Sequence, residues 1–455
     1  MEKFLSGGFE ELEGILCTDE KAATMQKNTE EQGLFDLYQS NPDEADYLLF
    51  GRETYPDRRG FLKKAGLAVM GAMVGAAIPF HRNIPAHFIP VVLASEDMIQ
   101  GKDGLTVLND HPLNAETPPH LLDDAITPTE RHFIRNNGIP PENTDAVGWK
   151  LTIDGLVDNP LTLSIDDLKQ RFEVVNRALT LECGGNGRAF FEPPADGSQW
   201  TYGAVACSEW TGVRLSDVLK AAGVKDNVVY TAHVGADTHV SGEKGRLPLS
   251  RGVPIEKAMD EHNLIAFAQN SKPIHPMNGA PLRLIIPGWS GSCSQKWLTR
   301  IWLRDQVHDG PKMTGMDYRI PNRMIVPGEK VDEKDFEIIH AMKVKSLITN
   351  PATGHKMAGR SLEVRGHAWA GDRKVDAVRL SIDFGATWID AKLDEPVNAY
   401  AWQNWRAEVA FPKAGYYEIW ARATDSQGIS QPHAITWNLK GYLNNSMHRV
   451  AVVVS

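Results

Sequence analysis

Apolar and polar residues alternate with a period of two in the last third of the chain. In residues 377–388 the residues between the apolar positions are mostly polar, and the apolar positions themselves are Val378, Leu380, Ile382 and Phe384. Similar short stretches recur nearby, and turn residues separate them about every 8–12 positions. Strands of this length and spacing are typical of two packed sheets. The pattern therefore predicts an all-β sandwich of immunoglobulin type over residues 335–455.

Strand and helix patterns are mixed in residues 95–330. The stretch from Trp149 alternates, turns at an Asp-Gly and an Asn-Pro pair, and then predicts a helix capped by Ser164 with Asp167 three residues later. The sequence "RLSDVLKAAGV" predicts a second short helix that ends at Gly223. Two further stretches, "APLRLIIPG" and "KWLTRIWLRD", predict strands around a glycine-rich loop. We expect one mixed α+β domain here.

The first part of the chain differs from the rest in charge. Residues 1–56 contain 13 acidic and four basic residues, whereas the whole chain has a net charge of −10, so the remainder is nearly neutral. This acidic segment has few aromatic residues and no clear period, which predicts a flexible extension. The negative net charge argues against binding to nucleic acid.

A targeting signal follows over residues 57–94. Two adjacent arginines, Arg58 and Arg59, precede "GFLKKAG" and a moderately apolar run from Ala65 to Phe80. This order predicts a twin-arginine export signal, with a small-residue cleavage site after Ala94, and a folded protein delivered to the periplasm. The alternative is a single membrane anchor, but the run is short and rich in glycine and alanine, so we expect no stable membrane span. Export in the folded state suggests a cofactor inserted beforehand.

The four cysteines, at positions 17, 183, 207 and 293, form no Cys-x-x-Cys pair. This spacing excludes a zinc ribbon, a thioredoxin motif and the usual covalent attachment of haem. A disulfide framework is not expected in so long a chain with so few cysteines.

One cysteine has unusual neighbours. In "LTLECGGNGRAFF" (179–191), Cys183 ends a run of strand-forming residues, and three glycines lie between it and Arg188. Glycines would let a bulky group approach the backbone, a thiolate is a soft metal ligand, and Arg188 would favour the thiolate or hold an anion. The alternatives are a buried structural cysteine and a bridge to Cys207, and the spacing alone does not exclude them.

Five motifs together identify a family. "LECGGNGR", "HFIRNNGIP" (132–140), the loop at 278–301, "MDYR", and "ATDSQGISQP" with "WNLKGYLNN" occur in this order between residues 125 and 455. Their sequence resembles that of the sulfite oxidase family of molybdopterin oxidoreductases, and within it the exported bacterial sulfite and sulfane dehydrogenases. The resemblance implies a molybdopterin-binding catalytic domain over 95–330, followed by a dimerisation domain over 335–455.

The resemblance also implies roles for individual residues. Cys183 would be the protein ligand of molybdenum, Tyr318 an active-site hydrogen-bond donor, Arg135 and Arg188 the source of a positive field for an oxyanion, and Trp200 a wall of the pocket. The other cofactor contacts would be Phe133, Arg135, Asn136, Asn137, Asp237, Asn278, Arg283, Ser294, Gln295 and Lys296. Among these, Arg283 and Lys296 would bind the pterin phosphate, and Ser294 and Gln295 would offer backbone amides. Four of these residues also have a plainer interpretation: Tyr318 and Trp200 as core aromatics, and Arg283 and Lys296 as solvated charges at strand ends.

Three positions depart from the family pattern. Asn137 and Asn278 stand where the family often has histidine, and an asparagine can still donate a hydrogen bond. Gln403 stands where we align a substrate-binding arginine of the family. The loss of one fixed positive charge would suit a bulkier or carrier-bound sulfur compound better than free sulfite.

The resemblance implies molybdenum-dependent oxidation of sulfane sulfur or sulfite by oxygen-atom transfer. No haem domain is recognisable, so electrons would pass to a separate c-type cytochrome, and a sulfur-carrier protein could present the substrate. A homodimer or a dimer of heterodimers is expected. The alternatives are a reductive member that acts on nitrate or an S-oxide, and a non-catalytic exported binding protein. The combination of Cys183, Arg188 and Tyr318 argues against the last of these.

Overall fold

The computed structural model describes residues 99–455, which belong to a single compact unit. The acidic extension predicted for residues 1–56 and the export signal predicted for 57–94 lie outside the described residues. Within the described part, no helix is long and apolar enough to cross a bilayer.

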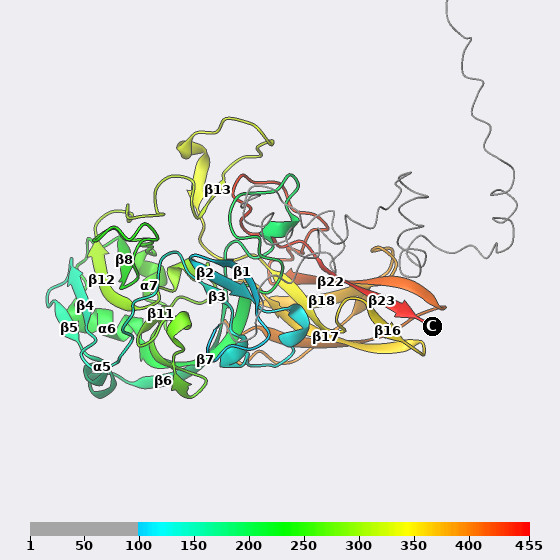
Figure 1. The fold of residues 1–455 in the computed structure, drawn as a ribbon, viewed down its shortest axis with the longest axis horizontal. Coiled ribbons are helices and arrows are strands. Elements are labelled where there is room, and N and C mark those ends of the chain that lie inside the picture. Colours follow the sequence, from blue (N-terminus) through cyan, green and yellow to red (C-terminus); the bar gives the residue numbers. More distant parts are fainter. Residues whose placement is uncertain (1–98) are drawn as a thin grey trace, which may run out of the picture. The chain divides into compact units, whose positions relative to one another are not determined.

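Strands dominate the described residues, and the α-helices are few and short: α5 (Ile165–Arg171), α6 (Leu215–Ala222) and α7 (Ile255–Ala258). The expected α+β class is therefore met only in part, because each predicted helix exists but covers two turns or so of chain. The helices pack beside sheets and form no layer of their own comparable in size to the sheets (Figure 1).

The first part of the described chain contains three sheets. A small antiparallel sheet has the order β1 (Thr106–Asp110), β2 (Leu113–Glu116), β3 (Ile134–Arg135). A second sheet has the order β10 (Lys272–Pro273), β9 (Leu264–Gln269), β7 (Val205–Arg214), β6 (Val174–Glu182), with β11 (Arg283–Ile285) also paired to β9. A third has the order β5 (Leu161–Leu163), β4 (Leu151–Gly155), β12 (Leu298–Arg304), β8 (Tyr230–Gly235), in which β12 runs parallel to β4 and antiparallel to β8.

Local sequence signals account for several of these elements. Strands β4 and β5 form the expected hairpin, and α5 begins with a complete capping box in which Ser164 accepts from the Asp167 amide and Asp167 accepts from the Ser164 amide. Helix α6 ends at Gly223, which adopts φ 72°, as expected for a glycine cap. The two predicted strands around the glycine-rich loop are β11 and β12.

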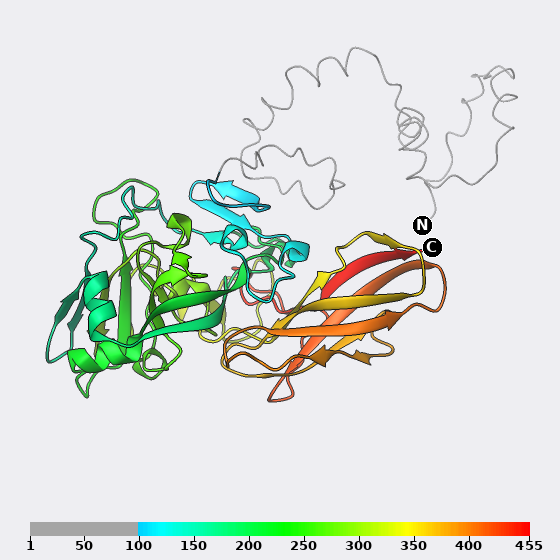
Figure 2. The ribbon, with the colours of Figure 1, turned by 90° about the horizontal axis from the view of Figure 1, so that it is seen from below.

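The C-terminal part consists of two sheets joined to the first part by the short ribbon β13 (Arg319–Pro321) and β14 (Phe336–Ile338). One sheet has the order β15 (Lys345–Asn350), β17 (Ser361–Trp369), β21 (Gln403–Ala410), β20 (Lys392–Leu393). The other has the order β16 (His355–Met357), β23 (His448–Val454), β22 (Gly415–Asp425), β18 (Val375–Ser381), β19 (Ile389–Asp390). Their inner faces share one apolar core, so the expected two-sheet packing is present (Figure 2).

One alternating position does not face this core. Val378 and Leu380 are buried as predicted, but β18 ends at Ser381 and Phe384 is 72% exposed. The chain turns at Asp383, which accepts hydrogen bonds from Ser381 and Thr387, and Phe384 takes a left-handed φ of 59°. The hydrogen bonds of this turn therefore end the strand at Ser381, although the alternation of apolar and polar residues continues in the sequence to Phe384.

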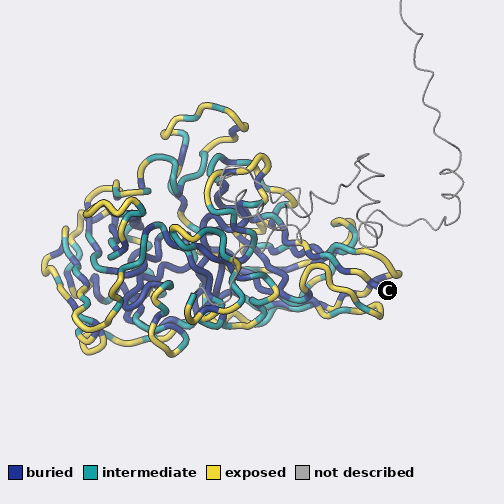
Figure 3. Tube along the Cα trace, in the orientation of Figure 1, coloured by how far each residue is buried: buried dark blue, intermediate teal, exposed yellow. Residues whose placement is uncertain are grey.

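Buried chain runs through the sheets, while exposed chain is concentrated in connecting loops (Figure 3). The predicted site residues lie mainly where strands end: Cys183 directly follows β6, Arg135 ends β3, and Asp237 comes two residues after β8. The fold therefore brings together loop residues that rigid strands hold in place.

The capping box of α5 gives a test of this local structure. Replacing Ser164 with Ala removes the acceptor for the Asp167 amide, and we expect a loss of about 1 kcal/mol in the free energy of unfolding. Urea denaturation followed by circular dichroism measures this loss. Thr162→Ala, at an exposed position of β5 outside the box, is the control, and equal stability of the two variants would contradict the assignment.

Candidate active site

Most of the residues singled out from the sequence line one cavity. These are Phe133, Arg135, Asn137, Cys183, Asp237, Asn278, Arg283, Ser294, Gln295, Lys296 and Tyr318. They come from segments up to about 185 positions apart in the chain, since Phe133 and Tyr318 mark the ends of the set. The structure thus brings together residues that were connected in the sequence only by a resemblance.

Cys183 lies on the wall of this cavity. It is 6% exposed, its amide donates to the Ala204 carbonyl, and its sulfur accepts from the amide of Gly185 at 3.4 Å. The cysteine is not in a disulfide, so the alternative of a bridge to Cys207 is excluded. Within residues 99–455 no three His, Cys, Asp or Glu side chains gather as a metal site. A metal at Cys183 would therefore need further ligands from a cofactor.

The glycines after Cys183 serve a different purpose from the one expected. A Cβ atom at Gly184 would lie 2.8 Å from Ser290 Oγ, and one at Gly185 would lie 2.5 Å from the guanidinium of Arg188. Both glycines therefore make room for neighbouring protein groups, and the expectation that they clear space for a bulky ligand is corrected.

Arg135, Asn137 and Tyr318 form a hydrogen-bonded group in the same lining, with Arg135 close to Cys183. The Arg135 guanidinium donates to Asn137 Oδ1 at 2.9 Å and to the Tyr318 hydroxyl at 3.4 Å, and that hydroxyl donates to Asn137 Oδ1 at 3.1 Å. Burial acts to lower the pKa of Arg135, but the Tyr318 and Cys183 groups outweigh it and raise that pKa above its ordinary value. Arg135 therefore stays cationic beside the thiol.

Tyr318 is held in an uncommon conformation. Its φ is 52°, in the left-handed region that bulky residues seldom occupy, and it is only 4% exposed. Its ring stacks on Tyr442 at 5.5 Å between centroids, and Arg251 lies over the ring and donates to its carbonyl. Packing on both sides maintains a backbone strain of the kind that is concentrated at functional sites.

Arg188 lies behind the cysteine loop and is not part of the cavity lining. Its guanidinium donates to the carbonyls of Lys440 and Ser198, both at 2.9 Å, and lies 5.0 Å from the ring of Tyr442. These partners are neutral, so the positive charge remains, but it acts on the cavity from the second layer of residues. Its contacts also tie the loop to the C-terminal segment.

Trp200 supports the wall from behind. It is fully buried, packs edge-on against Phe133, and belongs to a small apolar cluster that includes Cys183. The structure therefore places Trp200 next to the predicted site, but as part of the packing around it. Its indole nitrogen has no hydrogen-bond partner within the described residues.

Positive charge is concentrated at the other end of the cavity. Burial lowers the pKa of Lys102 to about 7 and that of Arg283 to about 9. Burial and the neighbouring Arg283 lower the pKa of Lys296 well below its ordinary value. The Asp237 carboxylate partly opposes this effect on Lys296, and burial raises the pKa of Asp237 itself to about 6. Such a cluster is costly unless an anion is bound.

Several buried polar atoms in the same region have no hydrogen-bond partner within residues 99–455. These are Asn136 Nδ2, Asp237 Oδ1, Arg283 Nε and Gln295 Oε1. Asn136 itself is held by the Lys296 ammonium, which donates to its side-chain oxygen. Free donors, free acceptors and excess positive charge together fit a polar, heteroatom-rich cofactor with a phosphate group. The amide of Ser294 already donates to Gly291, so it does not offer the predicted free donor.

Gln403 is not part of this cavity, and its predicted role as a substrate contact is corrected. It begins β21 and donates to the Asp394 carbonyl at 2.7 Å. Together with Trp369 and Tyr400 it lines a separate cavity of about 460 Å³. That cavity lacks the thiol, the arginines and the tyrosine of the site.

The sequence analysis missed several groups near the site. Lys102 donates to Asn278 Oδ1 at 2.5 Å, and Lys312 donates to Asn137 Oδ1 at 3.3 Å. Lys440 pairs with Asp317, next to Tyr318, at 3.5 Å. Lys440 lies within "WNLKGYLNN", which we used only to recognise the C-terminal domain, whereas nothing in the local sequence marks Lys102.

Comparisons with known proteins agree with this geometry. Residues 137–312 match the model of an oxidoreductase molybdopterin binding domain, and residues 336–455 match that of a Mo-co oxidoreductase dimerisation domain. Human mitochondrial sulfite oxidase is 34% identical over 372 residues, covering 77% of this chain, which spans 66% of the human protein. Sulfite oxidase of Gallus gallus is 31% identical over 76% of this chain and 77% of its own length.

Two further relatives bear on the chemistry. The NADH nitrate reductase of Ulva prolifera is 31% identical over 76% of this chain and 43% of its own length. The crystal structure of the sulfane dehydrogenase SoxCD from Paracoccus pantotrophus superposes with a TM-score of 0.64 at 26% identity, over 82% of this chain and 92% of that one. Two collinear domain matches, with a sulfite oxidase that is 31% identical and covered over 77% of its own length, establish that this chain belongs to the sulfite oxidase family of molybdopterin oxidoreductases.

Proposed function

We propose that the protein oxidises a sulfur compound, sulfite or a terminal sulfane sulfur, with a molybdenum–pterin cofactor held in the cavity at Cys183. The observation that carries the proposal is the sharing of one cavity by Cys183, Arg135, Tyr318 and the buried cations Arg283 and Lys296. Oxidation of sulfur is supported by the sulfite oxidases and the sulfane dehydrogenase among the similar proteins.

Some of these residues would bind the cofactor, and others would bind the substrate. Arg283 and Lys296 would bind the phosphate end, where Asp237 is the counter-charge beside Lys296, and Cys183 would ligate the metal from the other end. Bound molybdenum would supply oxygen-atom transfer and two-electron redox chemistry. Arg135 would orient an anionic substrate, and the Tyr318 hydroxyl, 3.4 Å from that guanidinium, would donate a hydrogen bond at the reacting centre by releasing the one it donates to Asn137.

The fixed charge around the site supports an anionic sulfur substrate. Arg135 lies in the lining and Arg188 behind the cysteine loop, while Lys312 and Lys440 share Asp317 as a partner and together add one net positive charge. The preference for sulfane sulfur that we based on Gln403 loses its support, since that residue lines another cavity. Nitrate reduction is a second candidate, which the nitrate reductase among the relatives favours. Parallel assays with sulfite, a sulfane substrate and nitrate distinguish the three.

The setting of the reaction is also part of the proposal. The twin-arginine pattern over residues 57–94 supports export of the folded protein to the periplasm. There a separate c-type cytochrome would accept the electrons, and a sulfur-carrier protein could present the substrate. The dimerisation-domain match over residues 336–455 supports assembly into a homodimer or a dimer of heterodimers.

Replacing Cys183 with Ser tests the metal ligand. We expect a folded protein that retains pterin but has no measurable turnover, because a hydroxyl is a poor substitute for a soft thiolate. Molybdenum analysis and steady-state assay measure the outcome, with Cys207→Ala, a buried cysteine outside the cavity lining, as the control. Activity close to that of the unaltered protein would remove Cys183 from the site.

Substitutions at Arg135 and Gln403 test which of the two cavities binds the substrate. Arg135→Met should lower kcat/KM for sulfite by about one to two decades, since a charge-assisted hydrogen bond contributes roughly 1.5–3 kcal/mol. Gln403→Arg should leave kcat/KM within about twofold, because Gln403 does not line the site. Kinetics at equal molybdenum content provide the comparison. A tenfold gain in sulfite kcat/KM from Gln403→Arg would return that residue to the substrate site.

Lys102 gives the cofactor-free protein a characteristic pH dependence. Its pKa is about 7 when folded and about 10.5 when unfolded, so between these values the unfolded chain binds one more proton. Stability should therefore rise with pH across this window, by up to about 1.4 kcal/mol per pH unit, and the destabilisation by the buried charge is fully present below pH 7. Lys102→Met should lower this slope by up to about 1.4 kcal/mol per pH unit and leave the contribution of Lys296, whose pKa burial also lowers.

Denaturation of the cofactor-free chain between about pH 7 and 9 measures that slope. Lys220→Met, whose side chain is 65% exposed, is the matched control and should retain it. If the stability of Lys102→Met rose with pH as steeply as that of the unaltered protein, Lys102 would not be a buried cation.

A further inference from the structure

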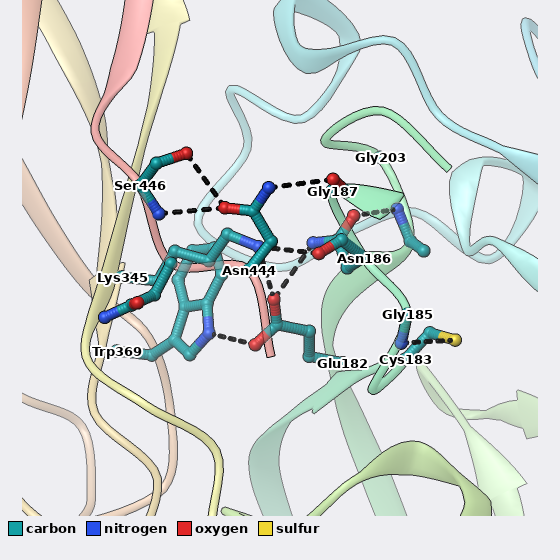
Figure 4. Close-up of polar contacts among 12 residues, drawn as sticks. Glu182, Cys183, Gly185, Asn186, Gly187, Gly203, Lys345, Trp369, Asn444 and Ser446 are labelled. Carbon is teal, nitrogen blue, oxygen red and sulfur yellow. Dashed lines mark hydrogen bonds and ion pairs between the residues drawn. The ribbon is translucent and has the colours of Figure 1, made fainter. Parts of the chain in front are cut away.

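The residue before the metal cysteine is a buried acid. Glu182 ends β6 and is 3% exposed, although glutamate is seldom buried without a partner. Its carboxylate extends toward the C-terminal domain, while the Cys183 sulfur points away from it (Figure 4). Two consecutive residues, Glu182 and Cys183, therefore direct a carboxylate toward the C-terminal domain and a thiol into the cofactor cavity.

Three donors surround this carboxylate. Lys345 on β15 donates to Oε1 at 2.9 Å, Asn186 donates to the same oxygen at 3.0 Å, and Trp369 on β17 donates to Oε2 at 2.7 Å (Figure 4). The side chain of Lys345 is 5% exposed, so the ion pair is shielded from water. Two of the three donors belong to the C-terminal domain.

Lys345 and the C-terminal segment also donate hydrogen bonds to the loop that follows Cys183. Lys345 donates to the Asn186 carbonyl at 3.3 Å, and the Asn186 amide donates to the Cys183 carbonyl at 2.9 Å. From the C-terminal segment, the Leu443 amide donates to Gly184 at 2.9 Å and Asn444 donates to Gly187 at 2.8 Å. The C-terminal domain thus holds the loop from Cys183 to Gly187 at three of its residues, Gly184, Asn186 and Gly187.

A buried ion pair is weak as a source of stability, since desolvation of two charges offsets most of their attraction. Removing one partner alone is strongly destabilising, because it leaves a buried charge uncompensated. An arrangement of this kind fixes one geometry and penalises the alternatives. Here the geometry in question is that of a loop whose first residue is the proposed metal ligand.

We propose that Glu182 and Lys345 are positioning residues, whose ion pair fixes the Cys183 loop against the C-terminal domain and so aims the thiol into the cavity. This inference rests on the proposed function only in taking Cys183 as the metal ligand. The C-terminal domain is then a part of the metal site's framework in addition to carrying the dimerisation match. Neither residue touches substrate in this account, and both act through Cys183.

The test measures the reactivity of the thiol in the full-length chain produced without cofactor. Each cysteine is labelled with iodoacetamide, and the rates are compared by mass spectrometry for Cys183, Cys207 and Cys293. The latter two are fully buried in the same part of the chain and report any general loosening. The variants are Lys345→Met, Glu182→Gln and the two combined.

We expect Lys345→Met to raise the labelling rate of Cys183 by at least about tenfold relative to the other two cysteines, since an unpaired buried carboxylate displaces the loop. The combined variant should return to within about threefold of the unaltered chain, because it restores neutrality at similar volume. Arg379→Met, which breaks the exposed ion pair with Asp390 in the same domain, is the matched control and should leave all three rates unchanged.

Equal acceleration of all three cysteines in Lys345→Met would show a merely structural role and overturn the proposal. So would an unchanged Cys183 rate, or a combined variant as reactive as the single one. Because labelling needs no metal, these outcomes are independent of the proposed function. If the unaltered protein purified with cofactor contained no molybdenum, the proposed function would fail while the positioning result could still hold.

Discussion

The site depends on an imbalance of buried charge. Lys102, Arg283 and Lys296 are enclosed around the cavity with Asp237 as the counter-charge that acts on Lys296, and burial depresses the pKa of each cation. A protein that keeps such a cluster needs an anion to complete it. One buried polar atom in each of Asn136, Asp237, Arg283 and Gln295 also lacks a hydrogen-bond partner within the described residues, and a polar ligand would supply one. These groups support our proposal that the cavity holds a phosphate-bearing, polar cofactor with its metal at the thiol of Cys183.

The sheets place these groups with little help from helices. Strands β3, β6 and β8 end near the cavity, and the loops that follow carry Asn137, Cys183 and Asp237. The C-terminal segment contributes from the other side through Tyr442, which stacks on Tyr318. The C-terminal part thus supports the site through Tyr442, while all the lining residues come from the preceding part of the chain.

What the sequence could predict is what short-range chemistry decides. The cap at Ser164 and the glycine at 223 follow from backbone hydrogen bonding within a few residues, and both are present. The motif around Cys183 identified the family. The reason for its glycines could not be predicted, because Ser290 is distant in the sequence and the Arg188 side chain folds back onto Gly185. Lys102 contacts Asn278 across 176 positions with no local signal. Gln403 was assigned from its neighbours in sequence, whereas the cavity that it lines is formed with residues distant in the sequence, such as Trp369.

The central claim is that a molybdenum–pterin cofactor lies in this cavity with Cys183 as the protein's ligand. The X-ray absorption spectrum at the molybdenum edge of the purified protein tests it most directly, combined with the molybdenum content per chain. The account predicts about one molybdenum per chain with a shell of about three sulfur neighbours, two from the pterin and one from the protein. A protein without molybdenum, or a metal with pterin sulfurs alone, would contradict it.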